Sequence, residues 1–221
     1  MEPTLRIESE LCRAGSTLVI GCDEVGRGAI AGPVAVGMVV LDAALVRLGR
    51  RRMPVGLRDS KLLAEPRREE LAPLCRAWAV RHAVGLASAA EVDEFGIIAA
   101  LGMAGARALD QLAALGVGLD GATLVLDGNH DYLSVAAPGC PTVLTRIKAD
   151  QTCGSVAAAS VIAKVHRDRM MIDRDVVTPG YGWVRNKGYA SPEHLEALGR
   201  LGISDFHRRT WIGEERLQAS A

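Results

Sequence analysis

At residues 18–28 the chain reads Leu-Val-Ile-Gly-Cys-Asp-Glu-Val-Gly-Arg-Gly. The apolar run predicts a buried strand over residues 17–23, which ends in two adjacent carboxylates, Asp23 and Glu24. Adjacent side chains on a regular strand point to opposite faces, so both acids serve one site only if the strand ends or bulges there. The glycines that follow are compatible with such an ending. The alternative is a solvent-exposed turn that carries two charges.

Two other segments place an acid at the end of an element. Asp127 ends the apolar run Thr123–Asp127, where the sequence Asp-Gly-Asn is equally typical of an Asx-type turn. Asp150 precedes a long alanine-rich segment, where the alternative is a helix N-cap. Carboxylates that gather without a cation repel one another. A site containing all four acids therefore favours Mg²⁺ or Mn²⁺, which take oxygen ligands.

The length and charge of the chain restrict its class. The 221 residues suit one domain, or one domain with a small appendage. A net charge of zero gives no global reason to expect a polyanionic partner. The stretch between Val46 and Arg68, however, contains eight basic residues and two acids. This basic stretch is either a surface that faces phosphates or a solvated loop and helix face.

The cysteines and the N-terminus indicate the compartment. The five cysteines are odd in number and contain no CxxC pair, which indicates reduced thiols and no zinc site. The chain begins without an apolar leader, and no apolar run approaches the ~20 residues needed to span a bilayer. We therefore expect a soluble cytoplasmic protein without a membrane segment.

The order of apolar runs and helical patterns predicts a mixed α/β sheet flanked by helices. Strands are expected over residues 17–23, 33–41, 78–87, 123–127 and 142–147. Helices are expected from residue 64, over 89–115 with Ser88 as N-cap, over 150–173 and over 191–201. The chain divides into an N-terminal lead-in at 1–16, a main domain at 17–178, and a C-terminal helical segment and tail at 179–221.

A turn with a glycine on each side of Arg27 lets the backbone approach a small ligand group closely. Gly26, Arg27 and Gly28 are therefore a candidate contact for a ribose 2′-hydroxyl, the group that distinguishes RNA from DNA. The glycines also resemble a Rossmann fingerprint. Their spacing, however, is G-x-G-x-x-x-G, and the turn leads into a second apolar strand instead of a helix, which argues against a dinucleotide site.

Other polar residues allow two interpretations each. Ser60 and Lys61, in the basic stretch, are candidates to hold a phosphate. Tyr189 either stacks on a sugar or base or packs in the core. Lys164 and Asp168 lie four residues apart and are expected to form an ion pair on a helix surface. The sequence His207-Arg208-Arg209 is either a second phosphate contact or a solvated tail.

Together these segments resemble the ribonuclease HII family, the bacterial type 2 ribonucleases H. The matching stretches occur in the family's order over nearly the whole chain: Gly21-Cys-Asp-Glu-Val-Gly-Arg-Gly28, Leu57-Arg-Asp-Ser-Lys61, Leu126-Asp-Gly-Asn129, Lys148-Ala-Asp150, Ala158-Ala-Ser-Val-Ile-Ala-Lys164, His166-Arg-Asp168 and Lys187-Gly-Tyr189. The resemblance implies a ribonuclease H-like catalytic domain with a five-stranded mixed sheet, helices on both faces and a small C-terminal helical segment.

The resemblance also implies roles for single residues. Four acids match the family's catalytic, metal-binding carboxylates: Asp23, Glu24, Asp127 and Asp150. Three residues match the motif that recognises the 2′-hydroxyl of a ribonucleotide: Gly26, Arg27 and Gly28. Tyr189 matches the tyrosine that stacks on the deoxyribose at an RNA–DNA junction. Lys61 and Lys164 fall in family motifs near the substrate phosphates.

We therefore expect an endonuclease that hydrolyses the RNA strand of RNA/DNA hybrids and nicks DNA 5′ to an embedded ribonucleotide. Two divalent ions, Mn²⁺ or Mg²⁺, held about 4 Å apart, would activate a water and stabilise the leaving 3′-oxygen, leaving 3′-hydroxyl and 5′-phosphate ends. Nucleic acid is the expected partner of a monomeric enzyme. The remaining alternative is a non-catalytic hybrid-binding protein, but four acids without a cation would repel nucleic acid.

Overall fold

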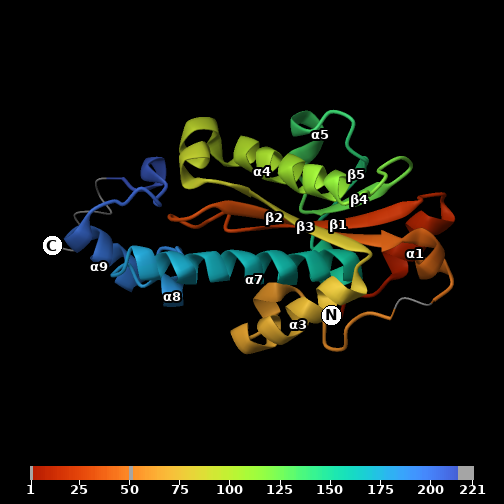
Figure 1. Ribbon diagram of the computed structural model, residues 1–221, viewed down its shortest axis with the longest axis horizontal. Coiled ribbons are helices and arrows are strands. Elements are labelled where there is room, and N and C mark those ends of the chain that lie inside the picture. The colour runs from red at the N-terminus through yellow and green to blue at the C-terminus, as the bar shows by residue number, and fades with distance from the viewer. Residues whose placement is uncertain (1, 50–51, 214–221) are drawn as a thin grey trace.

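A five-stranded mixed sheet forms the centre of the molecule in the computed structural model, which describes residues 2–49 and 52–213 (Figure 1). Its strands are β1 (Leu18–Val25), β2 (Val34–Asp42), β3 (Arg81–Ala87), β4 (Thr123–Asp127) and β5 (Thr142–Arg146). Their order across the sheet is β3-β2-β1-β4-β5. β2 runs antiparallel to β1 and β3, whereas β4 runs parallel to β1 and β5. The mixed α/β sheet expected from the sequence is confirmed.

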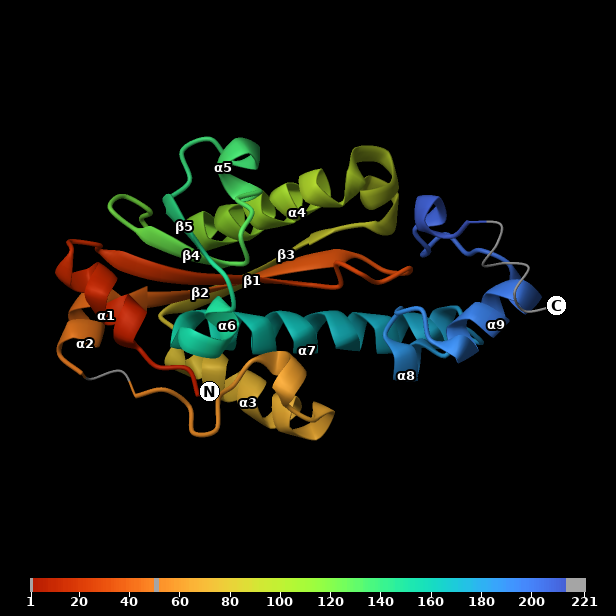
Figure 2. The same cartoon turned by 180° about the vertical axis from the view of Figure 1, so that it is seen from behind.

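Helices cover both faces of this sheet (Figures 1 and 2). One face carries α4 (Ala89–Ala114) and α5 (Leu133–Ala136), and the other carries α7 (Gly154–Val177) and α3 (Glu65–Trp78). The two ends of the molecule carry α1 (Arg6–Arg13) with α2 (Ala43–Arg47), and α8 (Trp183–Asn186) with α9 (Pro192–Leu201) (Figure 2). The remaining short elements are η1 (Ser60–Leu62), α6 (Ala149–Thr152) and η2 (Arg209–Trp211).

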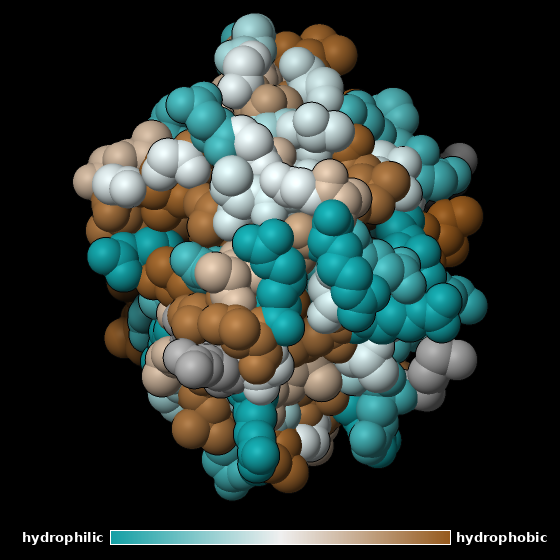
Figure 3. Space-filling model, turned by 90° about the vertical axis from the view of Figure 1, so that its right-hand side faces the viewer, coloured by the Kyte–Doolittle hydropathy of each residue, from teal (hydrophilic) through white to brown (hydrophobic). Residues whose placement is uncertain are grey.

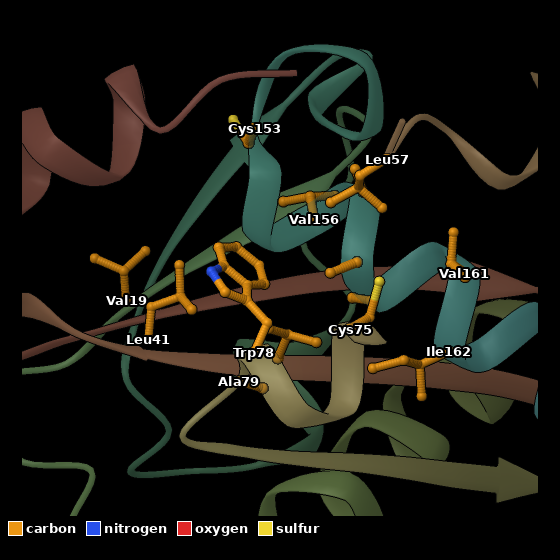
Figure 4. Packing of buried hydrophobic residues seen from close by; sticks show 14 of the residues in the cluster. Val19, Leu41, Leu57, Cys75, Trp78, Ala79, Cys153, Val156, Val161 and Ile162 are labelled. Carbon is orange, nitrogen blue, oxygen red and sulfur yellow. The ribbon is translucent and has the colours of Figure 1, made fainter. Parts of the chain in front are cut away.

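Alternate residues of β1 enter two separate cores, because successive side chains of a strand point to opposite faces. Val19 packs with Val156 and Trp78 on the α7 side, where the Trp78 ring points between α3 and α7 (Figure 4). Ile20 packs on the α4 side. Gly21 lies directly under α7, and a Cβ there would stand 2.2 Å from the carbonyl carbon of Ser155. α7 therefore crosses the strand in backbone contact.

The N-terminal lead-in contains a helix that fastens the start of α7. The side chain of Glu8 in α1 is buried and accepts hydrogen bonds from the backbone N–H and the hydroxyl of Ser155, both at 2.8 Å. A carboxylate in this position satisfies N–H groups that have no partner inside the helix. The surface at this end of the molecule intersperses hydrophobic with hydrophilic residues (Figure 3).

The structure corrects three expected boundaries. β1 continues to Val25, because β2 pairs with it in unbroken register to that residue. Trp78 ends α3 and does not begin a strand; its ring is buried against α7, and β3 starts at Arg81. The helix expected over 150–173 is two helices, because Cys153 between α6 and α7 has the extended angles φ −110° and ψ 124°.

α4 also differs from expectation. Its interior contains one residue with non-helical angles, Gly96 at φ 78°, where the helix bends. Within the described residues, α4 is the one helix that by its length and composition could cross a membrane. This differs from the expectation that no apolar run approaches the length of a membrane span. In this fold its buried residues pack on β2 and β3, as those of a core helix do.

The segment after α7 has a small core of its own, built around two buried histidines. The Nε2 atoms of His194 and His207 lie 3.0 Å apart. Trp183 donates from Nε1 to Nε2 of His194 (3.1 Å), and Nδ1 of His194 lies 2.9 Å from the carbonyl oxygen of Tyr189. The backbone N–H of Ser204 donates to Nδ1 of His207 (3.1 Å). These contacts fit two neutral rings, His194 donating from Nδ1 and His207 from Nε2.

We expect acid to destabilise the fold through His207. Burial lowers the pKa of His207 from 6.5 to about 4. Between these values the unfolded chain binds a proton that the folded chain excludes, so the free energy of unfolding falls as the pH decreases. Above the upper value the ring is neutral in both states and the effect vanishes. At about 1.4 kcal/mol per pH unit, the full loss approaches ~3 kcal/mol.

The measurement is urea unfolding of the wild type and of His207→Gln at several pH values between about 7 and 5. The decline should be shallower in the variant, because its neutral amide does not titrate. Carboxylates that titrate in the same range are present in both proteins and cancel in the comparison. Equal slopes would contradict the assignment.

Candidate functional site

The four predicted carboxylates gather at the sheet edge where β4 ends. The pairing of β1 with β4 stops at Cys22 and Leu126, so Asp127 lies beside Asp23 on the neighbouring parallel strand. Beyond that point β1 pairs with β2 alone, and its other edge is uncovered. Asp23 and Glu24 therefore flank one open edge from opposite faces of a regular strand. The expected strand end or bulge is not needed, because the neighbouring strand ends instead.

Asp127 also places the fourth acid. Its Oδ1 accepts a hydrogen bond of 2.6 Å from the backbone N–H of Ala149, the first residue of α6. Asp150 follows in the first turn of this helix and is buried. The N-cap interpretation of Asp150 is wrong, because the N-cap position belongs to Lys148, which has φ 57°. The carboxylate of Asp150 is thus left for the site.

Burial and neighbouring carboxylates raise the pKa values of three of these acids, Asp23, Glu24 and Asp150. Burial, followed by the charges of Glu24 and Asp127, raises the pKa of Asp23 well above its ordinary value. Burial raises the pKa of Glu24, although Arg27, with Nη1 3.6 Å from Oε1, partly compensates. Burial, Asp127 and Asp59 raise the pKa of Asp150 to about 7. The site therefore concentrates more negative charge than its own cations neutralise.

Oxygen atoms remain available for a metal ion. Asp23 and Asp127 each use Oδ1 to accept a backbone N–H, which leaves Oδ2 for a ligand. Oδ1 of Asp150 is buried without a partner among the described residues, while Oδ2 lies 3.8 Å from Nζ of Lys61. No three His, Cys, Asp or Glu side chains in residues 2–49 and 52–213 form a preassembled metal cluster. The donor set, all carboxylate oxygens with one orphaned atom, fits a hard divalent cation.

A pocket of about 320 Å³ opens beside these acids. It is lined by Glu24, Val25, Gly26, Arg27, Gly28, Ser60, Lys61, Lys164 and Tyr189. The set includes seven of the candidate substrate contacts, which come from four separate segments of the chain: Gly26, Arg27, Gly28, Ser60, Lys61, Lys164 and Tyr189. Glu24 belongs to both the acidic group and the pocket, so the two form one continuous site.

Hydrogen bonds to buried groups hold the segment around Ser60 and Lys61 in place. Ser60 donates from its N–H to Oγ of Ser160 on α7 (3.1 Å), and Asp59 accepts from the N–H of Lys61 (2.9 Å). The Ser60 side chain is buried, whereas 71% of the Lys61 side chain is exposed. Lys61 is therefore the member of this pair that can reach a ligand phosphate.

Lys164 and Asp168 form an ion pair, but not on the helix surface. Nζ of Lys164 lies 2.6 Å from Oδ1 of Asp168, and Asp168 is buried beside Arg68. The expectation of a surface pair is wrong because this face of α7 is covered by α3. Nζ of Lys164 also stands 5.5 Å from the centre of the Tyr189 ring. The ion pair therefore holds the Lys164 ammonium in a fixed position at the pocket.

The basic stretch between Val46 and Arg68 contributes less to the site than its charge suggests. Arg58 pairs with Glu2, and Arg67 pairs with Glu70. Of its described residues, Lys61 is the basic one that lines the pocket. Arg50 and Arg51 lie outside the described residues. Local ion pairing therefore explains much of the stretch.

The burial of two arginines behind the glycine-rich turn was not predicted from the sequence. Arg208 is fully buried and donates to the carbonyls of Gly26 (2.7 Å) and Arg27 (3.0 Å), so it is neither a phosphate contact nor part of a solvated tail. Arg167 is fully buried as well and donates to the carbonyl of Lys187 (2.8 Å). The available signal was the loop itself, whose small residues leave many carbonyls in need of donors.

Asp59, next to Ser60 and Lys61, is a further acid that sequence reasoning did not place in the site. It is buried, and its charge acts on Asp150.

The Rossmann alternative is excluded, because β2 and not a helix follows the turn.

Comparison with known proteins agrees with this geometry. The chain matches the family model for ribonuclease HII over residues 20–213. A ribonuclease HII of Streptomyces avermitilis is 46% identical over 211 residues, which cover 95% of this chain and 83% of that protein.

Solved structures give the same result for the fold. The ribonuclease H2 from Pyrococcus horikoshii OT3 superposes with a TM-score of 0.66 at 25% identity, over 92% of this chain and 98% of that one. Bst-RNase HIII in complex with Mn²⁺ has a TM-score of 0.72 at 20% identity, over 95% and 72% of the two chains, and shares the fold. The chain belongs to the ribonuclease HII family and is an endoribonuclease.

Proposed function

We propose that this ribonuclease cuts the RNA strand of RNA/DNA hybrids and nicks duplex DNA on the 5′ side of an embedded ribonucleotide. The observation that carries the proposal is the continuity of the site: Glu24 links the acidic group to the pocket that contains the Gly26–Gly28 turn. Hydrolysis and ribose recognition would then act on adjacent parts of one strand. A role in ribonucleotide excision repair follows from such a nick.

Divalent ions would be held by the four carboxylates, Asp23, Glu24, Asp127 and Asp150. Bound there, Mn²⁺ or Mg²⁺ would supply Lewis acidity and positive charge for phosphodiester hydrolysis, with 3′-hydroxyl and 5′-phosphate products. The unpartnered Oδ1 of Asp150 and the raised pKa values of the buried acids support this assignment. Lys61 restrains Asp150 and keeps the site from becoming purely anionic.

Recognition of the nucleic acid would fall to the rest of the pocket. Arg27 and Gly28 form the exposed tip of a turn that Ala29 closes with a hydrogen bond to the Gly26 carbonyl (3.2 Å). Such a tip suits close backbone contact with a 2′-hydroxyl. Tyr189 is 37% exposed, so its ring has a face available for stacking on a sugar. Lys61 and Lys164 would neutralise phosphates of the bound strand.

We also propose the organisation of the whole protein. Residues 17–178 would form the catalytic unit, and the segment 179–221 would contribute Tyr189 to substrate binding; residues 214–221 lie outside the described part. The pocket and the acids beside it come from one chain, which supports action as a monomer. The five cysteines form no disulfide, which supports a reducing compartment, the cytoplasm.

The proposal is tested with an end-labelled DNA duplex that carries one ribonucleotide, incubated with and without Mn²⁺. We expect a metal-dependent nick on the 5′ side of the ribonucleotide, and none in a matched all-DNA duplex. Asp127→Asn should lower the rate by at least about 100-fold, since an amide replaces a charged metal ligand. Full activity in EDTA, or full activity of Asp127→Asn, would contradict the scheme.

Removing one acid should also stabilise the metal-free protein. Asp23→Asn replaces a buried, repelled carboxylate by a neutral group of the same shape, and we expect the free energy of unfolding to rise by on the order of 1 kcal/mol. Mn²⁺ should raise the melting temperature of the wild type, because it binds the folded state alone, and should raise that of the variant less.

Asp110→Asn, an exposed acid of α4, is the matched control and should change neither quantity. A destabilised Asp23→Asn protein, or an undiminished response to Mn²⁺, would contradict the assignment of Asp23.

A further inference from the structure

The guanidinium of Arg208 is buried without an acidic partner. The residue has 0% exposure and forms no ion pair with a described carboxylate. Its three nitrogens donate instead to backbone carbonyls: Nη2 to Gly26 (2.7 Å), Nη1 to Arg27 (3.0 Å), and Nε and Nη2 to Gly32 (3.2 and 3.1 Å). A buried charge must be hydrogen-bonded, so these contacts fix the three carbonyls and the guanidinium relative to one another.

The direction of these carbonyls determines the direction of two N–H groups. In a trans peptide the C=O of one residue and the N–H of the next point in opposite directions. Because the Gly26 and Arg27 carbonyls point inward to Arg208, the N–H groups of Arg27 and Gly28 point away from it. Arg27 and Gly28 are exposed and line the pocket, and no described group accepts a hydrogen bond from either N–H. Two oriented donors are thus left for a ligand oxygen.

We propose that Arg208 is a positioning residue for ribonucleotide recognition, holding the Gly26–Gly28 turn so that the N–H groups of Arg27 and Gly28 face the 2′-hydroxyl side of the substrate. The inference rests on the proposed function of this site. Arg208 itself does not touch the nucleic acid, since its side chain is fully buried.

Arginine is suited to this task in a way that lysine is not. Its planar fork presents several N–H donors in fixed directions from three nitrogens, whereas the donors of an ammonium all radiate from one freely rotating nitrogen. A charged donor on a carbonyl also polarises the peptide group, which strengthens the N–H on its far side. Burial lowers the pKa of Arg208 only to about 10, so the group stays charged at neutral pH.

The surroundings keep Arg208 and the turn from adjusting separately. The N–H of Arg208 donates to the Ile30 carbonyl (2.8 Å), and the guanidinium carbon lies 5.0 Å from the centre of the Trp211 ring. On the other side, Gly26 has φ 84°, and a Cβ there would stand 2.1 Å from Nε of Arg167. The turn is thereby fixed between two guanidinium groups before substrate binds.

The test compares the affinities of two DNA duplexes that differ in a single ribonucleotide. Binding is measured with Ca²⁺ in place of Mn²⁺, and the recovered strands are checked to be uncut. The readout is the ratio of the two dissociation constants. A purely structural defect lowers the amount of active protein and leaves this ratio unchanged, whereas misdirected N–H groups lower the ratio.

Arg208→Lys should reduce the preference for the ribonucleotide at least about fivefold, with little change in affinity for all-DNA duplex. Arg200→Lys is the matched control, because Arg200 is an exposed arginine of α9 that donates to a carbonyl away from the turn, that of Gly180. It should keep the wild-type ratio. A wild-type ratio in folded Arg208→Lys would overturn the inference.

If circular dichroism shows that Arg208→Lys is unfolded, Arg208→Gln is measured instead. This change replaces the buried charge by a neutral amide, which can donate to fewer of the three carbonyls. A lowered ratio supports the positioning role, and a wild-type ratio overturns it. Equal binding of both duplexes by the wild type would overturn the proposed recognition of a ribonucleotide, and the present inference with it, so the two failures are distinguishable.

Discussion

The hydrogen bonds from two buried guanidinium groups to backbone carbonyls hold the functional half of this molecule together. Arg167 comes from α7 and Arg208 from the C-terminal segment, yet both donate into the connection between β1 and β2. An unpaired polar group in the interior is expensive, so neither the connection nor the C-terminal segment can move away without exposing a charge or orphaning carbonyls. The two arginines thereby couple three parts of the chain that are distant in sequence.

The group of four acids, in contrast, destabilises the metal-free protein, because its carboxylates repel one another. Asp23 and Asp150 are buried beside other carboxylates, and the nearby cations, Lys61 and Arg27, lie at 3.8 and 3.6 Å from their nearest acids. Stability and function are in conflict at such a site, as is common where charge is concentrated for catalysis. The rigid frame behind the turn tolerates this local strain, because its own polar groups are satisfied.

Much of this site was predictable from residue types at the ends of elements. The apolar runs before Asp23 and Asp127 determine the strands, and parallel pairing of neighbouring strands brings their ends together. The end of β1 was misjudged, because it depends on pairing with β2 and on where β4 stops, which no local pattern records. The alternative that Asp150 is an N-cap failed for a similar reason: α6 begins at Ala149, whose N–H donates to Asp127, and this contact is a tertiary feature.

The burial of Arg208 could not be predicted, because a basic triplet near a chain end is normally solvated. The same limit applies to the ion pair of Lys164 and Asp168, since its burial depends on where α3 packs. The misplacement of Trp78 in a strand has this origin too, as the residue ends a helix whose contacts lie on α7. Helical and strand periodicity thus identified the elements, whereas contacts between distant segments determined which single residues are buried and what they contact.

α7 also fixes the distance between the acidic group and the glycine-rich turn. It starts four residues after Asp150 and carries Lys164 and Arg167 one after the other along 24 residues of uninterrupted helix. At 1.5 Å per residue, the spacing between the hydrolytic end and the recognition end is therefore set by helix geometry and not by a flexible loop. One residue inserted before Lys164 would turn everything beyond it by about 100° and take Arg167 out of the β1–β2 connection. The length of this helix is thus as much a part of the active site as the side chains that it carries.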